Sequence, residues 1–192
     1  MCDYFAQALT NINYGPVAVC IKFLSEKGGR AVVLTLVRDP RSASKHRKYE
    51  PADPTDHWIE ENSGYALIYS RMRQTHVEPF LFQRFLPWAK SYKNTRLPAD
   101  WNKPKVWVIG FLLRHFRWPL PYKSSITVPI VPLDPNLHSQ QAIRGYLCVD
   151  SPRNWSFSKR YDVDMIRGMA DGIYNQIDEL YRLTHRETKQ HG

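Results

Sequence analysis

Two stretches of alternating residues, Tyr122–Leu133 and Ala142–Pro152, constrain the fold of this chain most strongly. In the first, aliphatic residues at 126, 128 and 130 alternate with Ser, Thr and Pro, as in a strand with one buried face. In the second, one face holds Ile143, Gly145, Leu147 and Val149, and the other holds Arg144, Tyr146, Cys148 and Asp150. A polar loop at 134–141 separates them, so we predict two strands. Pro129 has no amide donor, which indicates a sheet edge or a bulge.

A helix is predicted at each end of the chain. Asp3–Ile12 has a capping Asp and an apolar face, and a longer helix is predicted from about Asp162 to His185. The longer helix begins with acidic residues and ends with basic ones, as the helix dipole favours. Its apolar stripe has strict three-four spacing, which is typical of packing on a sheet or on another helix. The stripe consists of Val163, Ile166, Ala170, Ile173, Ile177 and Leu180.

The N-terminal half predicts a hairpin and then a helix. Val17–Leu24 and Ala31–Val37 are rich in β-branched residues and are joined by a turn that contains two glycines. The segment 38–53 is polar and basic, and Asp53 with Pro54 resembles a helix start. On that helix one face would carry Trp58, Asn62, Tyr65, Tyr69 and Met72. A buried Asn62 would need a hydrogen-bond partner.

The middle of the chain is aromatic and contains several prolines. Pro79 and Pro87 exclude one long helix over 78–92, so we expect a short strand or turn and then a short helix. The segment Lys103–Leu113 fits either a strand or a helix, and its periodicity does not decide between them.

Composition indicates one soluble globular domain of 192 residues with a net charge of +9, which favours anionic partners. No apolar run of about 18 residues is present, so no membrane span is expected. No signal-peptide pattern is seen, so a cytoplasmic location is expected, although a membrane anchor upstream of this chain stays open. Cys2, Cys20 and Cys148 are far apart and lack metal-site spacing, so we expect buried free thiols and no metal.

The segments Ile126–Ile130 and Ile143–Ser151, read as "Val-Pro-Ile" and "Gly-x-Leu-x-x-Asp-Ser", resemble the GAF domain family, with bacterial GAF-domain proteins as the nearest type. The resemblance extends over Tyr14–Leu183, and its C-terminal half is the more specific. It implies an α/β fold of the α+β type. A central antiparallel sheet of about six strands would carry the terminal helices on one face and a roofed ligand pocket on the other.

The resemblance also implies a single GAF-like domain over 1–192. Its parts would be a lead helix at 1–13, the core sheet and roof at 14–160, a C-terminal helix at 161–186 and a tail at 187–192. The expected function is a sensory or regulatory module that binds a small anionic or aromatic molecule and signals through its terminal helices. Its identity, and any cofactor, stay unknown. A homodimer through the C-terminal helix is also expected.

The candidate ligand-binding residues are aromatic, basic or polar, and most lie in or near the expected roof. Aromatic rings would stack on a flat ligand, and Arg or Lys would neutralise an anionic one. The candidates are Trp58, Asn62, Tyr65, Trp88, Tyr92, Arg96, Trp107, Arg114, Tyr122, Lys123 and Ser124.

Three other functions stay open at this point. The first is a degenerate domain that acts only in dimerisation or protein contact. The second is nucleic-acid binding through Arg38–Lys48, although no known nucleic-acid fold is recognisable. The third is catalysis, which we do not expect, because the histidines are scattered and no nucleophile elbow or phosphate loop is present.

Departures from the family pattern also narrow the function. The roof segment 90–121 contains no cysteine, so a chromophore attachment site is absent. The family's free-methionine-sulfoxide reductases need clustered roof cysteines, and here only Cys148 lies nearby. The family's best-known cyclic-nucleotide signature is absent too. We therefore expect no enzyme activity.

Overall fold

The computed structural model describes residues 1–12, 15–40, 57–72, 79–89, 92–95, 97, 117–137 and 142–190, without the side chains of 88, 135 and 185–190. In this part of the chain, six strands form one antiparallel sheet in the order β3-β2-β1-β6-β5-β4. The strands are β1 (Ala18–Lys27), β2 (Arg30–Arg38), β3 (His57–Trp58), β4 (Leu81–Gln83), β5 (Ser124–Ile130) and β6 (Gly145–Ser151). The expected α+β fold with a six-stranded antiparallel sheet is confirmed.

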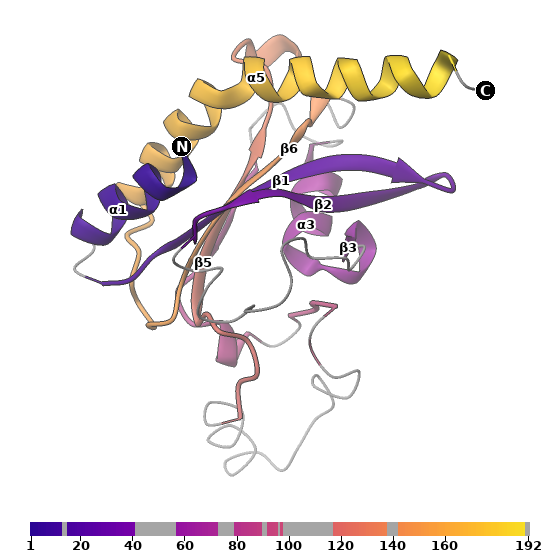
Figure 1. Cartoon of the computed structure of the whole chain (residues 1–192). Coiled ribbons are helices and arrows are strands. Elements are labelled where there is room, and N and C mark those ends of the chain that lie inside the picture. The colour runs from indigo at the N-terminus through magenta and orange to yellow at the C-terminus, as the bar shows by residue number, and fades with distance from the viewer. Residues whose placement is uncertain are drawn as a thin grey trace.

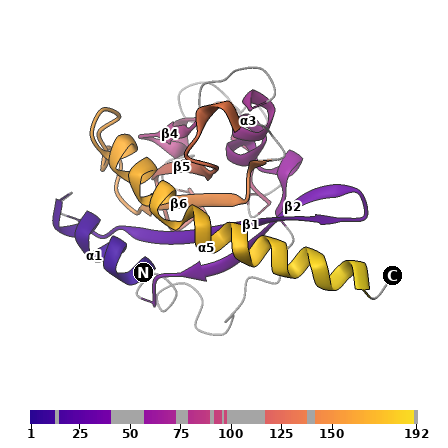
Figure 2. The ribbon, with the colours of Figure 1, turned by 90° about the horizontal axis from the view of Figure 1, so that it is seen from above.

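Helices cover both faces of this sheet. Helices α1 (Cys2–Ile12) and α5 (Asp162–Gln190) lie on one face, and α3 (Ser63–Arg71) lies on the other (Figures 1 and 2). Three short 3-10 helices complete the described elements: η1 (Ile59–Glu61), η2 (Leu86–Trp88) and η3 (Pro135–Leu137). Among the described helices, none is both long and apolar enough to cross a membrane.

The predicted strand pair forms the centre of the fold. β5 and β6 pair antiparallel, with Ile126 opposite Val149 and Val128 opposite Leu147. All four side chains are fully buried, and they pack with the apolar stripe of α5 from Val163 to Ile177. The stripe therefore packs on the sheet of its own chain, one of the two arrangements that its spacing allows. Arg144, just before β6, donates from Nε to Asp178 Oδ1 at 2.5 Å and fixes the middle of α5.

The predicted hairpin forms as β1 and β2. Its strands are joined by Gly28 and Gly29, whose φ angles of 58° and 76° suit a two-residue turn that residues with a side chain rarely adopt. β1 also pairs with β6, so it lies in the interior of the sheet. At Gly145 in β6, an added Cβ would lie 2.1 Å from the carbonyl oxygen of Lys22 in β1.

The predicted helix start at Asp53 is not what the described residues show. His57 and Trp58 pair with Val33 and Val32 of β2 as β3, and α3 begins only at Ser63. Trp58 has φ −58° and ψ 132°, which is not helical. Pairing with β2 gives the backbone of this segment hydrogen bonds that a helix would otherwise supply, so tertiary contacts override the local helix signal.

Other boundaries follow the prediction more closely. β4 and η2 form the expected short strand and short helix. β4 pairs with β5 only at 125–127, so within the described chain Pro129 lies on an unpaired edge, as predicted. The last helix continues to Gln190, past the predicted end at His185 and into the expected tail. The segments 41–56 and 103–113, including the basic loop, lie outside the described residues.

Candidate ligand-binding cavity

A small cavity of about 50 Å³ lies over β5 and β6, on the face of the sheet that carries α3. Most of its lining is polar, and the lining residues come from five separate stretches of the chain. They are Asn62, Gly64, Tyr65, Leu81, Tyr92, Lys93, Asn94, Tyr122, Ser125, Thr127, Cys148 and Asp150.

The floor of the cavity comes from strand alternation. Ser125 and Thr127 of β5 and Cys148 and Asp150 of β6 line it, whereas their neighbours along each strand point to the α5 side. Ser125, Thr127 and Cys148 are buried. Buried polar groups cost stability unless they are hydrogen-bonded. This half of the sheet is therefore apolar toward α5 and polar toward the cavity.

One wall of the cavity is the start of α3. Asn62 is 3% exposed, and its amide nitrogen donates to the Trp58 carbonyl oxygen at 2.9 Å. Its amide oxygen accepts from the backbone nitrogen of Thr95 at 3.3 Å. Ser63 adds three hydrogen bonds to Lys93, because its backbone nitrogen and its hydroxyl both donate to the Lys93 carbonyl, and the hydroxyl also accepts from the Lys93 nitrogen. The segment 92–95 is therefore held against α3.

The opposite wall is a pair of tyrosines. The hydroxyls of Tyr92 and Tyr122 lie 3.4 Å apart, and the Asn94 side chain donates to the Tyr122 hydroxyl at 3.1 Å. The ring of Trp118 packs against Tyr92, and its indole nitrogen donates to the Tyr122 carbonyl at 2.6 Å. These contacts orient both hydroxyls together at the cavity.

Burial alters the ionisation of the lining groups. It raises the pKa of Asp150 to about 6, although the nearby cations Arg38 and Lys22 act in the opposite direction. It also raises the pKa of Cys148 to about 12 and holds the pKa of Tyr122 well above its ordinary value. Within the described chain, no hydrogen bond to the Asp150 carboxylate is formed. No group of three His, Cys, Asp or Glu residues in that part of the chain could hold a metal ion.

Two cysteines that are distant in sequence pair across β1 and β6, and one of them, Cys148, lines the cavity floor. Cys20 of β1 and Cys148 of β6 are direct cross-strand partners, both buried as free thiols in the same cluster. The hydroxyl of Tyr65 lies 3.5 Å from the Cys148 sulfur. Sequence spacing treated these cysteines as unrelated, and only the β1–β6 pairing brings them together.

Four of the predicted ligand-binding residues line this cavity: Asn62, Tyr65, Tyr92 and Tyr122. Three others are described but lie outside its lining. Trp58 packs its ring under the guanidinium of Arg30 at 4.1 Å, Lys123 bonds through its backbone to Leu86 and Ser151, and the Ser124 hydroxyl donates to the Arg153 carbonyl. Trp88 is described only in its backbone, at the end of η2. Arg96, Trp107 and Arg114 lie outside the described residues.

Asp150, Ser125 and Thr127 were missed as candidates, although they face the cavity. A signal for them exists in the sequence. The two strand stretches alternate between aliphatic and polar residues, and the polar residues belong to one common face. When two adjacent strands carry polar residues on the same face, this pattern predicts a polar cavity floor such as this one.

No protein-family model matches the chain, and no curated protein matches its sequence. Solved structures do match. The structure of a type II free methionine-R-sulfoxide reductase from Thermoplasma acidophilum has a TM-score of 0.54 and 15% identity, covering 92% of this chain and 89% of that one. The GAF domain of an Acinetobacter phosphoenolpyruvate-protein phosphotransferase has a TM-score of 0.49 and 11% identity, covering 96% and 84%. A sensor histidine kinase domain from Sinorhizobium meliloti has a TM-score of 0.46 and 11% identity, covering 96% and 93%.

The expectation that this chain is not an enzyme is corrected by these comparisons. The reductase has the same fold and is an enzyme, so this fold does not argue against catalysis. At this level of identity the likeness is one of fold. Together with the sheet order and the placement of α1, α3 and α5, it shows that this chain shares the α+β fold of the Thermoplasma reductase.

Proposed function

We propose that the cavity over β5 and β6 binds a small polar molecule and that binding changes the packing of α5. The observation that carries this proposal is the convergence of a carboxyl, a thiol and several hydroxyls on one cavity of about 50 Å³. A sheet face that only packs against a helix is better served by aliphatic residues, as the α5 side of the same strands is. Polar groups that disturb such a core are expected at functional sites.

The lining determines the chemistry of the ligand. Asp150 accepts hydrogen bonds, and the hydroxyls of Tyr92, Tyr122 and Thr127 donate or accept. The ligand is therefore a molecule with a donor, such as an ammonium or hydroxyl group, that faces Asp150. The cavity volume of about 50 Å³ exceeds the share of one water molecule in the liquid, which is about 30 Å³. A ligand larger than the cavity fits only if the segment 92–94, which is hydrogen-bonded to Ser63, moves outward.

The cavity and α5 lie on opposite faces of the same two strands, β5 and β6. Thr127 and Cys148 line the cavity, and their neighbours Val128 and Leu147 pack on the other side with the stripe of α5. A shift of β5 or β6 on ligand binding therefore changes the surface on which α5 rests. This supports signalling through the C-terminal helix.

Dimerisation through α5 stays a prediction. The stripe from Val163 to Ile177 is buried against the sheet of its own chain, so it is not available to a partner. Beyond it, Leu183 is 52% exposed. A dimer would have to use this later part of α5, and sedimentation equilibrium measures whether one forms.

Free methionine-R-sulfoxide is the first probe to use, because a protein of this fold reduces a molecule of that name. It carries an ammonium group, from which the Asp150 carboxylate can accept a hydrogen bond. We expect it to bind the full chain in calorimetry, and we expect Asp150→Asn to weaken binding by about tenfold or more, since hydrogen bonds to charged groups contribute roughly 1.5–3 kcal/mol.

Asp164→Asn is the matched control for this measurement. Asp164 lies in the first turn of α5, with its side chain 74% exposed, so the same substitution there should leave binding unchanged. If no probe from a set of amino acids and polyols binds, and native mass spectrometry finds nothing bound to the purified chain, the proposed function is wrong.

Thiol-dependent reduction is a second candidate function, and the pairing of Cys20 with Cys148 favours it. Cα atoms of directly opposed antiparallel residues lie about 4.5–5.5 Å apart. That separation is within the range of about 4.4–6.8 Å that a disulfide requires. Cys148 also lines the cavity. Two thiols with this arrangement have the two electrons that reduction of a sulfoxide needs.

The balanced reaction consumes one sulfoxide and both thiols. The sulfur–oxygen bond of the substrate breaks, a sulfur–sulfur bond forms between Cys20 and Cys148, and the oxygen leaves as water with the two thiol protons. An external dithiol then reduces the disulfide. Burial works against this candidate, because a Cys148 pKa of about 12 leaves little thiolate at neutral pH.

Turnover decides this second candidate. With dithiothreitol as the reductant, release of methionine from free methionine-R-sulfoxide should stop in Cys148→Ser and in Cys20→Ser if the candidate is right. Cys2→Ser is the control, since Cys2 is a buried thiol of α1 that does not line the cavity. Turnover that is no faster than dithiothreitol alone would exclude the candidate.

A further inference from the structure

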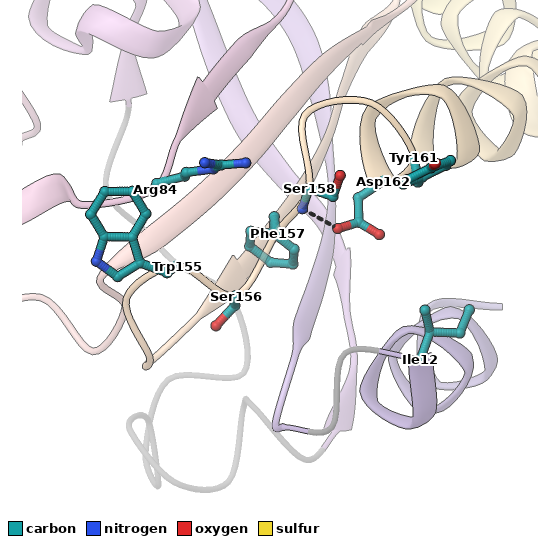
Figure 3. A pocket seen from close by; sticks show the side chains of 8 residues that line it. All are labelled: Ile12, Arg84, Trp155, Ser156, Phe157, Ser158, Tyr161 and Asp162. Atoms are coloured by element: carbon teal, nitrogen blue, oxygen red, sulfur yellow. Dashed lines mark hydrogen bonds between the residues drawn. The ribbon is translucent and has the colours of Figure 1, made fainter.

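A second hollow, here named the Trp155 groove, lies at the start of α5, away from the cavity. It has a volume of about 560 Å³ and is lined by Ile12, Arg84, Trp155, Ser156, Phe157, Ser158, Tyr161 and Asp162. Figure 3 shows Arg84 and Trp155 together at one end, Phe157 between, and Tyr161 and Asp162 at the α5 end. Pockets for small molecules commonly measure about 300–1,000 Å³.

Trp155 is held in an unusual backbone conformation. Its φ of 61° is the one positive value among the described residues other than glycine. This region is costly for a bulky side chain, and such strain gathers at functional sites. The backbone nitrogen of Trp155 donates to the Arg84 carbonyl at 2.9 Å. The ring of Trp155 lies nearly parallel to that of Phe85, with the ring centres 6.3 Å apart, and the residue is still 63% exposed. The positive φ of Trp155 therefore lowers the stability of the fold while it holds a large aromatic ring at the surface.

Arg84 has a charge that the described residues leave unpaired. Its Cζ lies 5.8 Å from the ring centre of Trp155 and 5.5 Å from that of Phe82. No carboxylate in the described chain pairs with it. The other arginine that stacks on a tryptophan behaves differently, because Arg30 lies over Trp58 and also pairs with Glu60. Within the described part of the chain, the guanidinium of Arg84 thus places a positive charge beside an exposed ring without a carboxylate to neutralise it.

The rest of the groove is fixed and adds further cations at its edge. The Ser158 backbone nitrogen donates to Asp162 Oδ2 at 2.6 Å, which holds the loop at the start of α5. The buried ring of Phe157 belongs to the core and forms a rigid base. Lys159 and Arg160 are exposed next to the lining, and Arg160 lies 5.4 Å from the ring centre of Tyr161. Cations therefore outnumber the single lining carboxylate.

The geometry points to a second binding site, in which the Trp155 groove takes a small aromatic anion. The ring of the ligand stacks on the indole of Trp155, and its anionic group pairs with the guanidinium of Arg84. A nucleoside monophosphate represents this class, because it joins a flat ring to a phosphate. The inference does not depend on the cavity, since the two sites share no lining residue.

The test is calorimetry on the full chain with AMP, adenosine and inorganic phosphate as separate probes. AMP should bind at least about tenfold more tightly than either of the others, because only AMP offers both stacking and charge. Trp155→Asn removes the ring and keeps a residue that tolerates a positive φ, so the fold should persist. Trp155→Asn and Arg84→Ala should each weaken AMP binding about tenfold or more.

Arg30→Ala is the matched control, because it removes the other arginine that stacks on a tryptophan. AMP binding to Arg30→Ala should equal that of the unchanged chain. The inference is overturned if AMP does not bind at millimolar concentration, if inorganic phosphate binds as tightly as AMP, or if Trp155→Asn binds AMP as well as the unchanged chain does. These results can be interpreted even if the cavity over β5 and β6 binds no probe, because the two sites share no lining residue.

Discussion

Gly145→Ala is expected to lower the free energy of unfolding by about 3 kcal/mol, at the upper end of what overpacking costs. The added Cβ would lie 2.1 Å from the Lys22 carbonyl oxygen and 3.4 Å from the Phe23 Cα. These are backbone atoms of β1, so no side chain can rotate away. Gly145 also pairs with Ile130 of β5, which leaves β6 little room to move to its other side. Urea unfolding, followed by circular dichroism, measures the loss.

Gly172→Ala is the matched control for this substitution. It adds the same methyl group, but nothing lies within 4 Å of the new Cβ on α5. Alanine favours a helix over glycine by about 1 kcal/mol, so this variant should be more stable than the unchanged chain. Equal stability of Gly145→Ala and the unchanged chain would contradict the close approach of β1 and β6.

Much of the fold follows from periodicity in the sequence. The alternation in 122–133 and 142–152 correctly predicts β5 and β6, because each strand buries an aliphatic face against α5. The three-four stripe predicts α5 for the same reason, since a helix with one apolar face needs a surface to cover it. These signals are local, and the structure that they predict is local.

Non-local pairing accounts for the part that sequence did not predict. Asp53 and Pro54 look like a helix start, but Trp58 pairs with Val32 on β2, and no residue near Asp53 reveals that. Cys20 and Cys148 look unrelated until β1 and β6 are placed side by side. Both cases depend on strand order, which single-sequence patterns do not determine.

The cavity over β5 and β6 could be predicted from the sequence to a greater extent than the Trp155 groove. Asn62, Tyr65, Tyr92 and Tyr122 were predicted as ligand-binding residues, and the structure brings them together at one cavity. That they bind a ligand is still a prediction. The Trp155 groove had no signal of comparable strength. Arg84 follows β4 and Trp155 follows β6, and their contact needs a backbone hydrogen bond between two loops.

Asp150 should make the stability of this chain depend on pH. Its pKa is raised from 3.8 to about 6 in the folded state, mainly by burial. Between these two values the folded chain binds more protons than the unfolded chain, so the Asp150 contribution to stability falls as pH rises from about 4 to about 6. Above that window the contribution is constant, and the buried charge costs about 2–3 kcal/mol.

Asp150→Asn isolates this effect, because asparagine has nearly the same shape and does not ionise. The difference in unfolding free energy between the variant and the unchanged chain should be smallest near pH 4. It should then grow in favour of the variant until about pH 6.5, reaching about 2–3 kcal/mol. Urea unfolding at half-unit pH steps measures this difference. Asp164→Asn is the control on exposed helix surface and should show no such rise.

The opposite sign would be equally informative. If the unfolding free energy of the unchanged chain rises relative to that of Asp150→Asn as pH rises, the attraction of Arg38 and Lys22 outweighs burial and keeps the carboxylate charged in the folded state. The raised pKa of Asp150 would then be wrong. If the predicted sign is found, the Asp150 carboxylate destabilises the chain at neutral pH, and replacing it with an amide makes the chain more stable. Stability is commonly given up at residues that function needs. The loss at Asp150 is therefore an independent argument for a ligand in the cavity, since a bound ammonium group would offset the cost of that charge.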